Sequence, residues 1–96
     1  MFTRSLKKEV EFMANYAVIF NYSFDDEVAV YLFSDENDAK KFLKANYEKE
    51  LKIDTEENGW NSFGSILEDG WYAKITNVFY DCEDVTEFRI GVVHLQ

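Results

Sequence analysis

The sequence contains no proline, four glycines, one cysteine and one histidine among its 96 residues. Because the single cysteine, Cys82, cannot form an internal disulfide, the fold does not depend on an oxidising compartment and we expect a cytoplasmic protein. Neither Cys82 nor His94 has a partner visible in the sequence for nucleophilic catalysis or zinc binding. The glycines form no phosphate-binding loop. These absences predict a protein that is not an enzyme and needs no cofactor.

Positive charge and long apolar segments are also scarce. The chain has 10 Lys and Arg against 19 Asp and Glu, which gives a formal net charge of −9. Such a charge repels phosphate backbones and anionic lipids, whereas it attracts basic protein surfaces. No apolar run approaches the roughly 20 residues of a membrane span, and no signal-peptide pattern opens the sequence. We expect a basic protein surface as partner, with no direct nucleic-acid contact and no membrane contact.

Aromatic residues, in contrast, are abundant at 18% of the chain. Disordered acidic segments lack the aromatic residues that build a core, so this composition predicts a folded protein. Its length suits one domain with a single core.

The first twelve residues have two interpretations. Lys8-Glu9-Val10 can be encoded by codons that contain a bacterial ribosome-binding sequence, at the usual distance before Met13. On that hypothesis translation begins at Met13, residues 1–12 are a translated leader and the domain spans 13–96. The alternative is an amphipathic first helix that carries Phe2, Leu6 and Val10 at near-helical spacing.

Two strands are predicted near the start of the domain. Residues 16–24 alternate between aromatic or apolar residues and smaller or polar ones, which is the period of a strand. The polar turn Asp25-Asp26-Glu27 then leads into the apolar run 28–33, so the two strands form an antiparallel hairpin. Because residues 28–33 are apolar on both faces, we expect this strand to be central.

A helix is predicted over residues 36–52. Ser34 and Asp35 can cap it, and carboxylates in its first turn complement the helix dipole. Its predicted buried stripe is Ala39, Phe42, Leu43, Tyr47 and Leu51.

The second half of the chain begins with a weaker pattern. Residues 53–70 contain no Lys or Arg and predict a long acidic connection, with a short helical turn over 62–67. Two further strands then alternate from Trp71 to Phe79 and from Phe88 to His94, joined by the turn Asp81-Cys82-Glu83-Asp84.

The predicted fold is therefore α+β: a four-stranded antiparallel sheet of order β-β-α-β-β, with two hairpins and one amphipathic helix packed on one face. The other face of the sheet needs a cover. Its candidate aromatic residues are Tyr31, Phe33, Tyr72 and Tyr80, and the N-terminal segment, the long connection or a partner would bury them.

A doubled pattern marks the acidic connection, Glu57-Asn58-Gly59-Trp60 and Glu68-Asp69-Gly70-Trp71. Each Gly suits a tight turn because it reaches positive φ, and each Trp would anchor the chain that leaves the turn. The functional alternative is an exposed Trp60 that acts as an interface hot spot between carboxylates.

Carboxylates gather in the turns and loops. If the strand over residues 71–79 ran parallel to the strand over 28–33, the carboxylates of the helix start and of the 81–84 turn would lie at the same end of the molecule. A divalent cation could bind such oxygens, and a metal-dependent hydrolase is one hypothesis, but no run has the spacing of a calcium loop. We predict instead that the carboxylates act as a collective negative field on a partner. The candidate partner-binding residues are Asp25, Asp26, Glu27, Asp54, Glu56, Glu57, Trp60, Glu68 and Asp69.

Four segments carry a resemblance: residues 20–25, 53–60, 68–75 and 84–91. In these the chain resembles small acidic proteins of unknown function carried by phages and mobile elements of Firmicutes, over residues 13 to about 93. The resemblance implies a context in which compact acidic proteins, anti-CRISPR proteins among them, occupy nucleic-acid-binding surfaces of host proteins. That step is an analogy.

Two functions follow as expectations. The first is a non-enzymatic acidic binding module, encoded by a mobile element, that mimics nucleic-acid charge on a basic host protein. The second is a small structural subunit that forms homodimers through a sheet face or a free strand edge.

Overall fold

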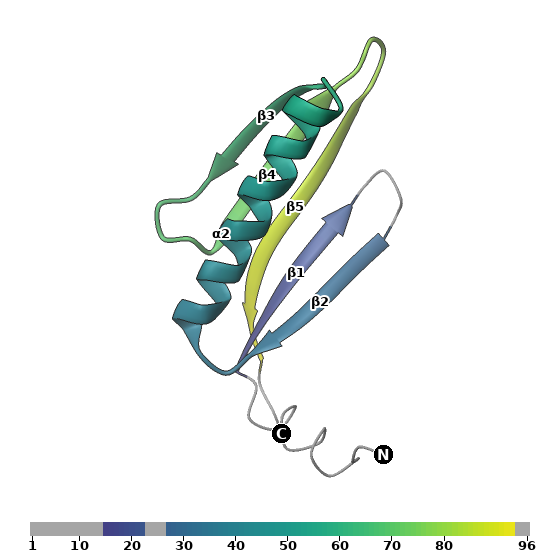
Figure 1. Cartoon of the computed structure of the whole chain (residues 1–96). Coiled ribbons are helices and arrows are strands. Elements are labelled where there is room, and N and C mark those ends of the chain that lie inside the picture. Colours follow the sequence, from purple (N-terminus) through teal and green to yellow (C-terminus); the bar gives the residue numbers. More distant parts are fainter. Residues whose placement is uncertain (1–14, 23–26, 94–96) are drawn as a thin grey trace, which may run out of the picture.

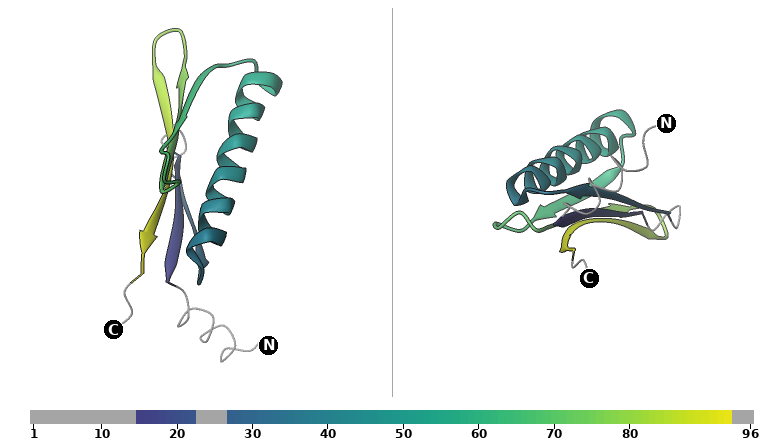
Figure 2. Two further views of the ribbon diagram at one scale, coloured as in Figure 1. Left: turned by 90° about the vertical axis from the view of Figure 1, so that its left-hand side faces the viewer. Right: turned by 90° about the horizontal axis from the view of Figure 1, so that it is seen from below.

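The computed structural model describes residues 15–22 and 27–93, which form one sheet and one long helix (Figure 1). In chain order the elements are β1 (Tyr16–Tyr22), β2 (Glu27–Phe33), α2 (Glu36–Lys52), the π-helix η1 (Ile53–Glu57), β3 (Asn61–Ile66), β4 (Tyr72–Val78) and β5 (Glu83–Val92). The five strands are antiparallel in the order β2-β1-β5-β4-β3. Helix α2 covers one face of the sheet (Figure 2). The α+β class and the single covering helix are confirmed, while the expected four strands are wrong by one.

The core lies between α2 and the middle of the sheet. In β1 every second side chain faces the helix, and Val18 and Phe20 pair across the ladder with Ile90 and Phe88 of β5. These side chains are buried because the period of two puts all of them on one face. Aromatic contacts join the cluster, such as the edge-to-face contact of Phe20 and Phe88 at 5.0 Å between ring centroids.

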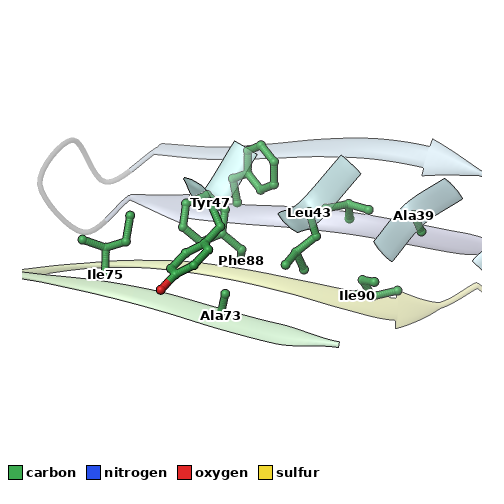
Figure 3. Close-up of a cluster of buried hydrophobic side chains, with 9 residues drawn as sticks. Ala39, Leu43, Tyr47, Ala73, Ile75, Phe88 and Ile90 are labelled. Atoms are coloured by element: carbon green, nitrogen blue, oxygen red, sulfur yellow. The ribbon is translucent and has the colours of Figure 1, made fainter. Parts of the chain in front are cut away.

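Helix α2 has the bounds that its sequence predicts. The Asp35 carboxylate accepts a hydrogen bond of 3.0 Å from the Asp38 backbone N–H and so caps the first turn. Ala39, Leu43 and Tyr47 are spaced by four residues and are buried against the sheet (Figure 3). Phe42 and Leu51, the other members of the predicted stripe, are partly buried against the same core.

Strand β3 corrects the expectation of a helical turn over residues 62–67. Its sequence, Asn-Ser-Phe-Gly-Ser-Ile, alternates too weakly to predict a strand, and five of its six residues are exposed. The backbone ladder with β4 holds it, and Gly64 allows it to approach the helix. A Cβ at position 64 would collide with the hydroxyl of Tyr47 and lie 2.8 Å from Leu51 Cδ2. Long-range pairing and a missing side chain therefore decide this strand, and neither has a local signature.

The turns on both sides of β3 agree with the sequence. Gly59 and Gly70 have φ of 67° and 79°, the left-handed region that side chains other than Gly rarely adopt. The doubled Gly-Trp pattern thus marks the two ends of the segment that contains the missed strand.

Strand β2 lies at the edge of the sheet and not at its centre, as we had expected. Its outward residues Val28, Val30 and Leu32 are 57%, 54% and 44% exposed. Apolar residues on both faces suggested a central strand, but the pattern does not distinguish burial from an uncovered apolar face.

Two of the aromatic residues expected on the uncovered face lie under the helix instead. Tyr31 and Phe33 contact Phe42 of α2, with ring centroids 4.9 and 5.0 Å apart. The register explains this: Tyr31 pairs with Val18, and directly opposed residues share a face. The expectation for Tyr31 and Phe33 was wrong because it included the β1–β2 hairpin but not its register.

The face away from α2 holds Tyr72 in a mostly polar setting. The Tyr72 hydroxyl donates a hydrogen bond of 2.6 Å to Glu87 Oε2, which raises the pKa of Tyr72 to about 12, with burial adding to the effect. Tyr80 lies in the β4–β5 turn and is fully exposed. No helix in the described part of the chain is long and apolar enough to cross a membrane. Residues 1–12, Met13, Asp25, Asp26 and His94, on which several expectations fall, lie outside the described residues.

Candidate functional site

The helix widens into the π-helix η1 directly after α2, and this places Asp54 against Asn77 of β4. The Asn58 N–H donates to the Ile53 carbonyl at 2.9 Å, and the Trp60 N–H donates to the Asp54 carbonyl at 2.8 Å. Wider turns of this kind occur often at functional sites. Here the turn brings one buried carboxylate and one Trp to the same end of the molecule.

Asp54 is 3% exposed and its carboxylate is bonded to two amides. Asn77 Nδ2 donates to Oδ2 at 3.1 Å, and Asn58 Nδ2 donates to Oδ1 at 3.4 Å. The Asn77 amide is in turn bonded through its oxygen to the Ser62 hydroxyl. Buried polar groups need such partners. Asp54, expected to contact a partner, is therefore enclosed, and it ties η1 to β4.

A pocket of about 220 Å³ opens beside this network. Five elements and loops contribute to its wall: β1, the last turn of α2, the η1 segment, β4 and β5. Its lining residues are Tyr22, Glu50, Asp54, Asn58, Trp60, Asn77, Asp84 and Thr86. The wall thus combines three carboxylates with two aromatic rings and several neutral polar groups.

Trp60 is half-buried and not fully exposed. Its ring packs edge-to-face on Phe79, with 5.2 Å between centroids. Part of the indole remains available at the pocket, because Trp60 is one of the lining residues. The two expectations for Trp60, an anchor after a turn and a surface contact, are therefore compatible.

Two of the titratable side chains that line the pocket, Glu50 and Tyr22, have raised pKa values. Burial raises the pKa of Glu50 above its usual 4.5, and the neighbouring Asp54 carboxylate raises it further, while Lys49 opposes both. Burial also raises the pKa of Tyr22, with smaller contributions from Glu50, Tyr31 and Glu27. Both raised pKa values have the same meaning: additional negative charge is disfavoured in this pocket.

Exposed carboxylates surround the pocket on η1 and on the β4–β5 turn. Figure 1 shows both segments at the top of the molecule, with η1 at the end of the helix and the turn at the tip of the sheet. We call this region the acidic end and define it by its carboxylate residues: Glu27, Glu50, Asp54, Glu56, Glu57, Asp81, Glu83 and Asp84. Lys49 and Lys52 of the last helical turn are the basic residues beside it.

These carboxylates form no ion pair with any residue that the structure describes. In the described ranges 15–22 and 27–93, the one ion pair within 4 Å joins Lys40 and Glu36, 2.8 Å apart and far from the acidic end. The negative charge of the acidic end is therefore left to solvent or to a binding partner.

The sheet directions correct the assumed placement of the charged turns. Because β4 is antiparallel to β5 and β5 to β1, β4 runs opposite to β2. The β4–β5 turn covers residues 79–82 and not the expected 81–84, since β5 begins at Glu83. This turn lies with η1, and the helix start lies at the other end. The assumption of a third strand parallel to the second is wrong.

The predicted partner-binding residues are divided between these two ends. Glu27, which pairs with Tyr22, joins Glu56, Glu57 and Trp60 at the acidic end, whereas Glu68 and Asp69 lie in the β3–β4 turn beside the start of α2. There the Asp69 carboxylate accepts a hydrogen bond of 3.0 Å from the Trp71 N–H. Asp25 and Asp26 lie outside the described residues.

Sequence reasoning did not select several pocket residues: Tyr22, Glu50, Asn77, Asp84 and Thr86. One signal was present. Asn77 occupies an inward position of the alternating strand Ala73, Ile75, Asn77, where an amide needs a buried partner. Nothing in the sequence indicates that this partner is Asp54, since 23 residues separate them.

Neither metal ligation nor similarity assigns a role to this site. In the part of the chain that the structure describes, no three His, Cys, Asp or Glu side chains are placed to hold a metal ion. No family model, no curated protein and no solved structure matches the chain.

Proposed function

We propose that this protein is a cytoplasmic, non-enzymatic binding module that docks its acidic end on a basic protein surface. The single observation that carries the proposal is that the carboxylates of the acidic end have no ion-pair partner within the described residues, while the half-buried Trp60 lies among them. Carboxylates that lack local partners attract a basic surface over long range, and a Trp at the centre supplies apolar contact after docking.

The arrangement also supports mimicry of nucleic-acid charge. The exposed residues Glu56, Glu57, Asp81 and Glu83 come from two segments that meet at one end, so their charges form a cluster that a phosphate-binding surface would accept. Together with the resemblance to acidic proteins of phages and mobile elements, this favours an inhibitor that occupies a nucleic-acid-binding site of a host protein. The anti-CRISPR comparison is an analogy within that class.

The test compares two charge reversals of the same kind. Glu57 and Glu68 are both exposed and form no side-chain hydrogen bond or ion pair among the described residues, but Glu57 is at the acidic end and Glu68 is in the β3–β4 turn. Glu57→Lys and Glu68→Lys change the net charge equally, so any difference between them reports position.

The experiment is capture of partners from lysate of the native host on the immobilised full chain at low and high salt, followed by competition with duplex DNA. We expect the chain to retain a basic protein at low salt, and we expect high salt or DNA to release it. Glu57→Lys should retain much less of this protein than Glu68→Lys does. Failure to retain any basic protein at low salt, or equal loss by both variants, would refute the proposal.

A second candidate function is a structural subunit that self-associates along β2. Val28, Val30 and Leu32 give this edge strand an exposed apolar face, and neither Pro nor Lys interrupts it. Sedimentation at several salt concentrations separates the candidates: a homodimer that salt does not affect, and that Val30→Lys dissociates, would favour this second function.

A further inference from the structure

The pocket at the acidic end is too small for an ordinary ligand but suits one side chain. Pockets that enclose whole small molecules measure roughly 300–1,000 Å³. This pocket measures about 220 Å³ and opens to solvent within the acidic end. Its size therefore suits the end of one extended side chain.

The polar groups of the wall are mostly acceptors. Glu50, Asp54 and Asp84 contribute carboxylates, and the amides of Asn58 and Asn77 already donate to Asp54. No Lys or Arg lines the pocket, so an anion would find no charged partner in it. The wall selects a cationic donor.

The Thr86 hydroxyl is a further polar group of the pocket. Thr86 is 9% exposed and lines the pocket, and its hydroxyl forms no hydrogen bond within residues 15–22 and 27–93. Every buried side-chain nitrogen or oxygen in this part of the chain has a partner, so solvent reaches the Thr86 hydroxyl through the pocket. A head group that enters the pocket would replace this water and bond to the hydroxyl.

The aromatic residues distinguish an organic cation from a metal ion. The rings of Trp60 and Tyr22 line the same pocket, and a cation within about 6 Å of an aromatic face is attracted to it. The described residues offer no cluster of ligands for a metal ion. An organic cation can use both kinds of wall, because its aliphatic stem packs on rings while its head bonds to carboxylates.

We propose that this pocket receives the guanidinium or ammonium group of one arginine or lysine side chain of the basic partner. This inference rests on the proposed function and adds its specific anchor. The head group would bond to Glu50, Asp84 and the Thr86 hydroxyl, and the stem would pack on Trp60. Burial and Asp54 already disfavour the charged form of Glu50, and a bound cation would relieve that cost.

The experiment is an NMR titration of the isotope-labelled full chain with the methylamides of N-acetyl-arginine and N-acetyl-lysine. The neutral control is the methylamide of N-acetyl-citrulline, which has nearly the shape of arginine but no charge. The chain contains an internal control, because Trp60 lies at the pocket and Trp71 lies at the other end. We expect saturable shifts of the Trp60 indole and the Thr86 amide, no movement of the Trp71 indole, and no response to citrulline.

Matched variants assign the binding to the pocket. Glu50→Gln and Asp84→Asn should each abolish the Trp60 shift, whereas Glu68→Gln removes an equal charge from the β3–β4 turn, away from the pocket, and should retain it. Each variant's unperturbed Trp71 indole position reports that it has folded. Whichever of the arginine and lysine probes causes the larger shift of the Trp60 indole carries the preferred head group.

The inference is wrong if citrulline shifts Trp60 as arginine does, if both indoles move together, or if both pocket variants keep the response. The proposed function survives such a result when Glu57→Lys still abolishes capture of the basic host protein. Conversely, if the pocket binds arginine but no basic host protein is captured, the pocket assignment stands and the proposed function fails.

Discussion

The two ends of this molecule are both rich in carboxylates but use them differently. At the start of α2, Asp35 caps the helix, Asp69 accepts from the Trp71 N–H in its own turn, and Glu36 pairs with Lys40. Lys40 also lies over the Trp71 ring, 5.6 Å from its centroid. At the acidic end, Glu56, Glu57, Asp81 and Glu83 are exposed and form no side-chain hydrogen bond or ion pair within the described residues.

The difference shows that composition alone does not identify a binding surface. A carboxylate that caps a helix or closes a turn is already used by the fold, and its charge is partly balanced by backbone dipoles. A carboxylate without such a partner contributes mainly to the external field. The comparison thus separates Asp69, a turn residue, from Glu56 and Glu57 within one set of candidates.

The largest expected effect concerns Asp54, the one carboxylate of the acidic end that the fold uses. Asp54→Ala leaves the buried Asn77 amide without its acceptor and should lower the free energy of unfolding by about 2–3 kcal/mol. The neighbouring exposed Glu56→Ala should change it by less than about 0.5 kcal/mol. Urea unfolding of the two variants measures both values. Similar values for both would mean that the amide network does not hold η1 in place.

Gly64 tests what keeps β3 against the helix and so closes the acidic end. Gly64→Ala places a methyl group against Tyr47 and Leu51 and should cost about 2 kcal/mol through overpacking. Gly91→Ala is the matched control, because the nearest atom to its new Cβ is Ile19 Cδ1 at 4.0 Å. Thermal unfolding should show a lower Tm for the first variant and an almost unchanged Tm for the second. Equal shifts would contradict the close approach of β3 to α2.

The contrast between the ends predicts that replacing an aspartate by alanine lowers stability at the helix start but not at the acidic end. Asp35→Ala removes the helix cap and should cost about 1 kcal/mol. Asp81→Ala removes an exposed carboxylate from an unpaired cluster and should leave stability unchanged, or raise it slightly at low salt because repulsion falls. Denaturant unfolding at two salt concentrations measures both. A comparable loss for Asp81→Ala would show that the acidic end also uses its surface carboxylates locally.

The smallest expected effect is the pH dependence that Glu50 contributes. Because burial and Asp54 raise the folded pKa of Glu50 above 4.5, the ionised form destabilises the fold as pH rises through that folded pKa. Glu50→Gln should therefore have a slightly higher Tm than the parent chain at neutral pH, and the difference should vanish below pH 4.5. A pH series of thermal unfolding curves measures it. Parallel curves at all pH values would contradict the raised pKa.

Local patterns predicted the elements that carry strong local signals. The bounds of α2 followed from Asp35, the first-turn carboxylates and the Ala39-Leu43-Tyr47 spacing. Helix caps and a buried helical stripe depend on residues that are close together in the sequence, so a local pattern reveals them. The alternation around Val18 and Phe88 likewise predicted two of the strands.

The misses share a different cause. β3 depends on its ladder with β4 and on the space left by Gly64, and the edge position of β2 depends on which strand joins β1 on its other side. The enclosure of Asp54 required β4 to lie beneath η1. Each outcome is set by residues far apart in the chain, so no window of sequence contains it.

The sequence by itself determined the negative charge, the amphipathic helix, the two glycine turns and most of the strand periods, because these follow from composition and from neighbouring residues. Only the tertiary structure decided which carboxylates are used by the fold and which remain unpaired. Strand order and direction bring η1 and the β4–β5 turn to one end, and they leave Glu68 and Asp69 at the other. The physical reason is that charge is a property of each residue, whereas its neutralisation depends on which distant groups the folded backbone places within reach.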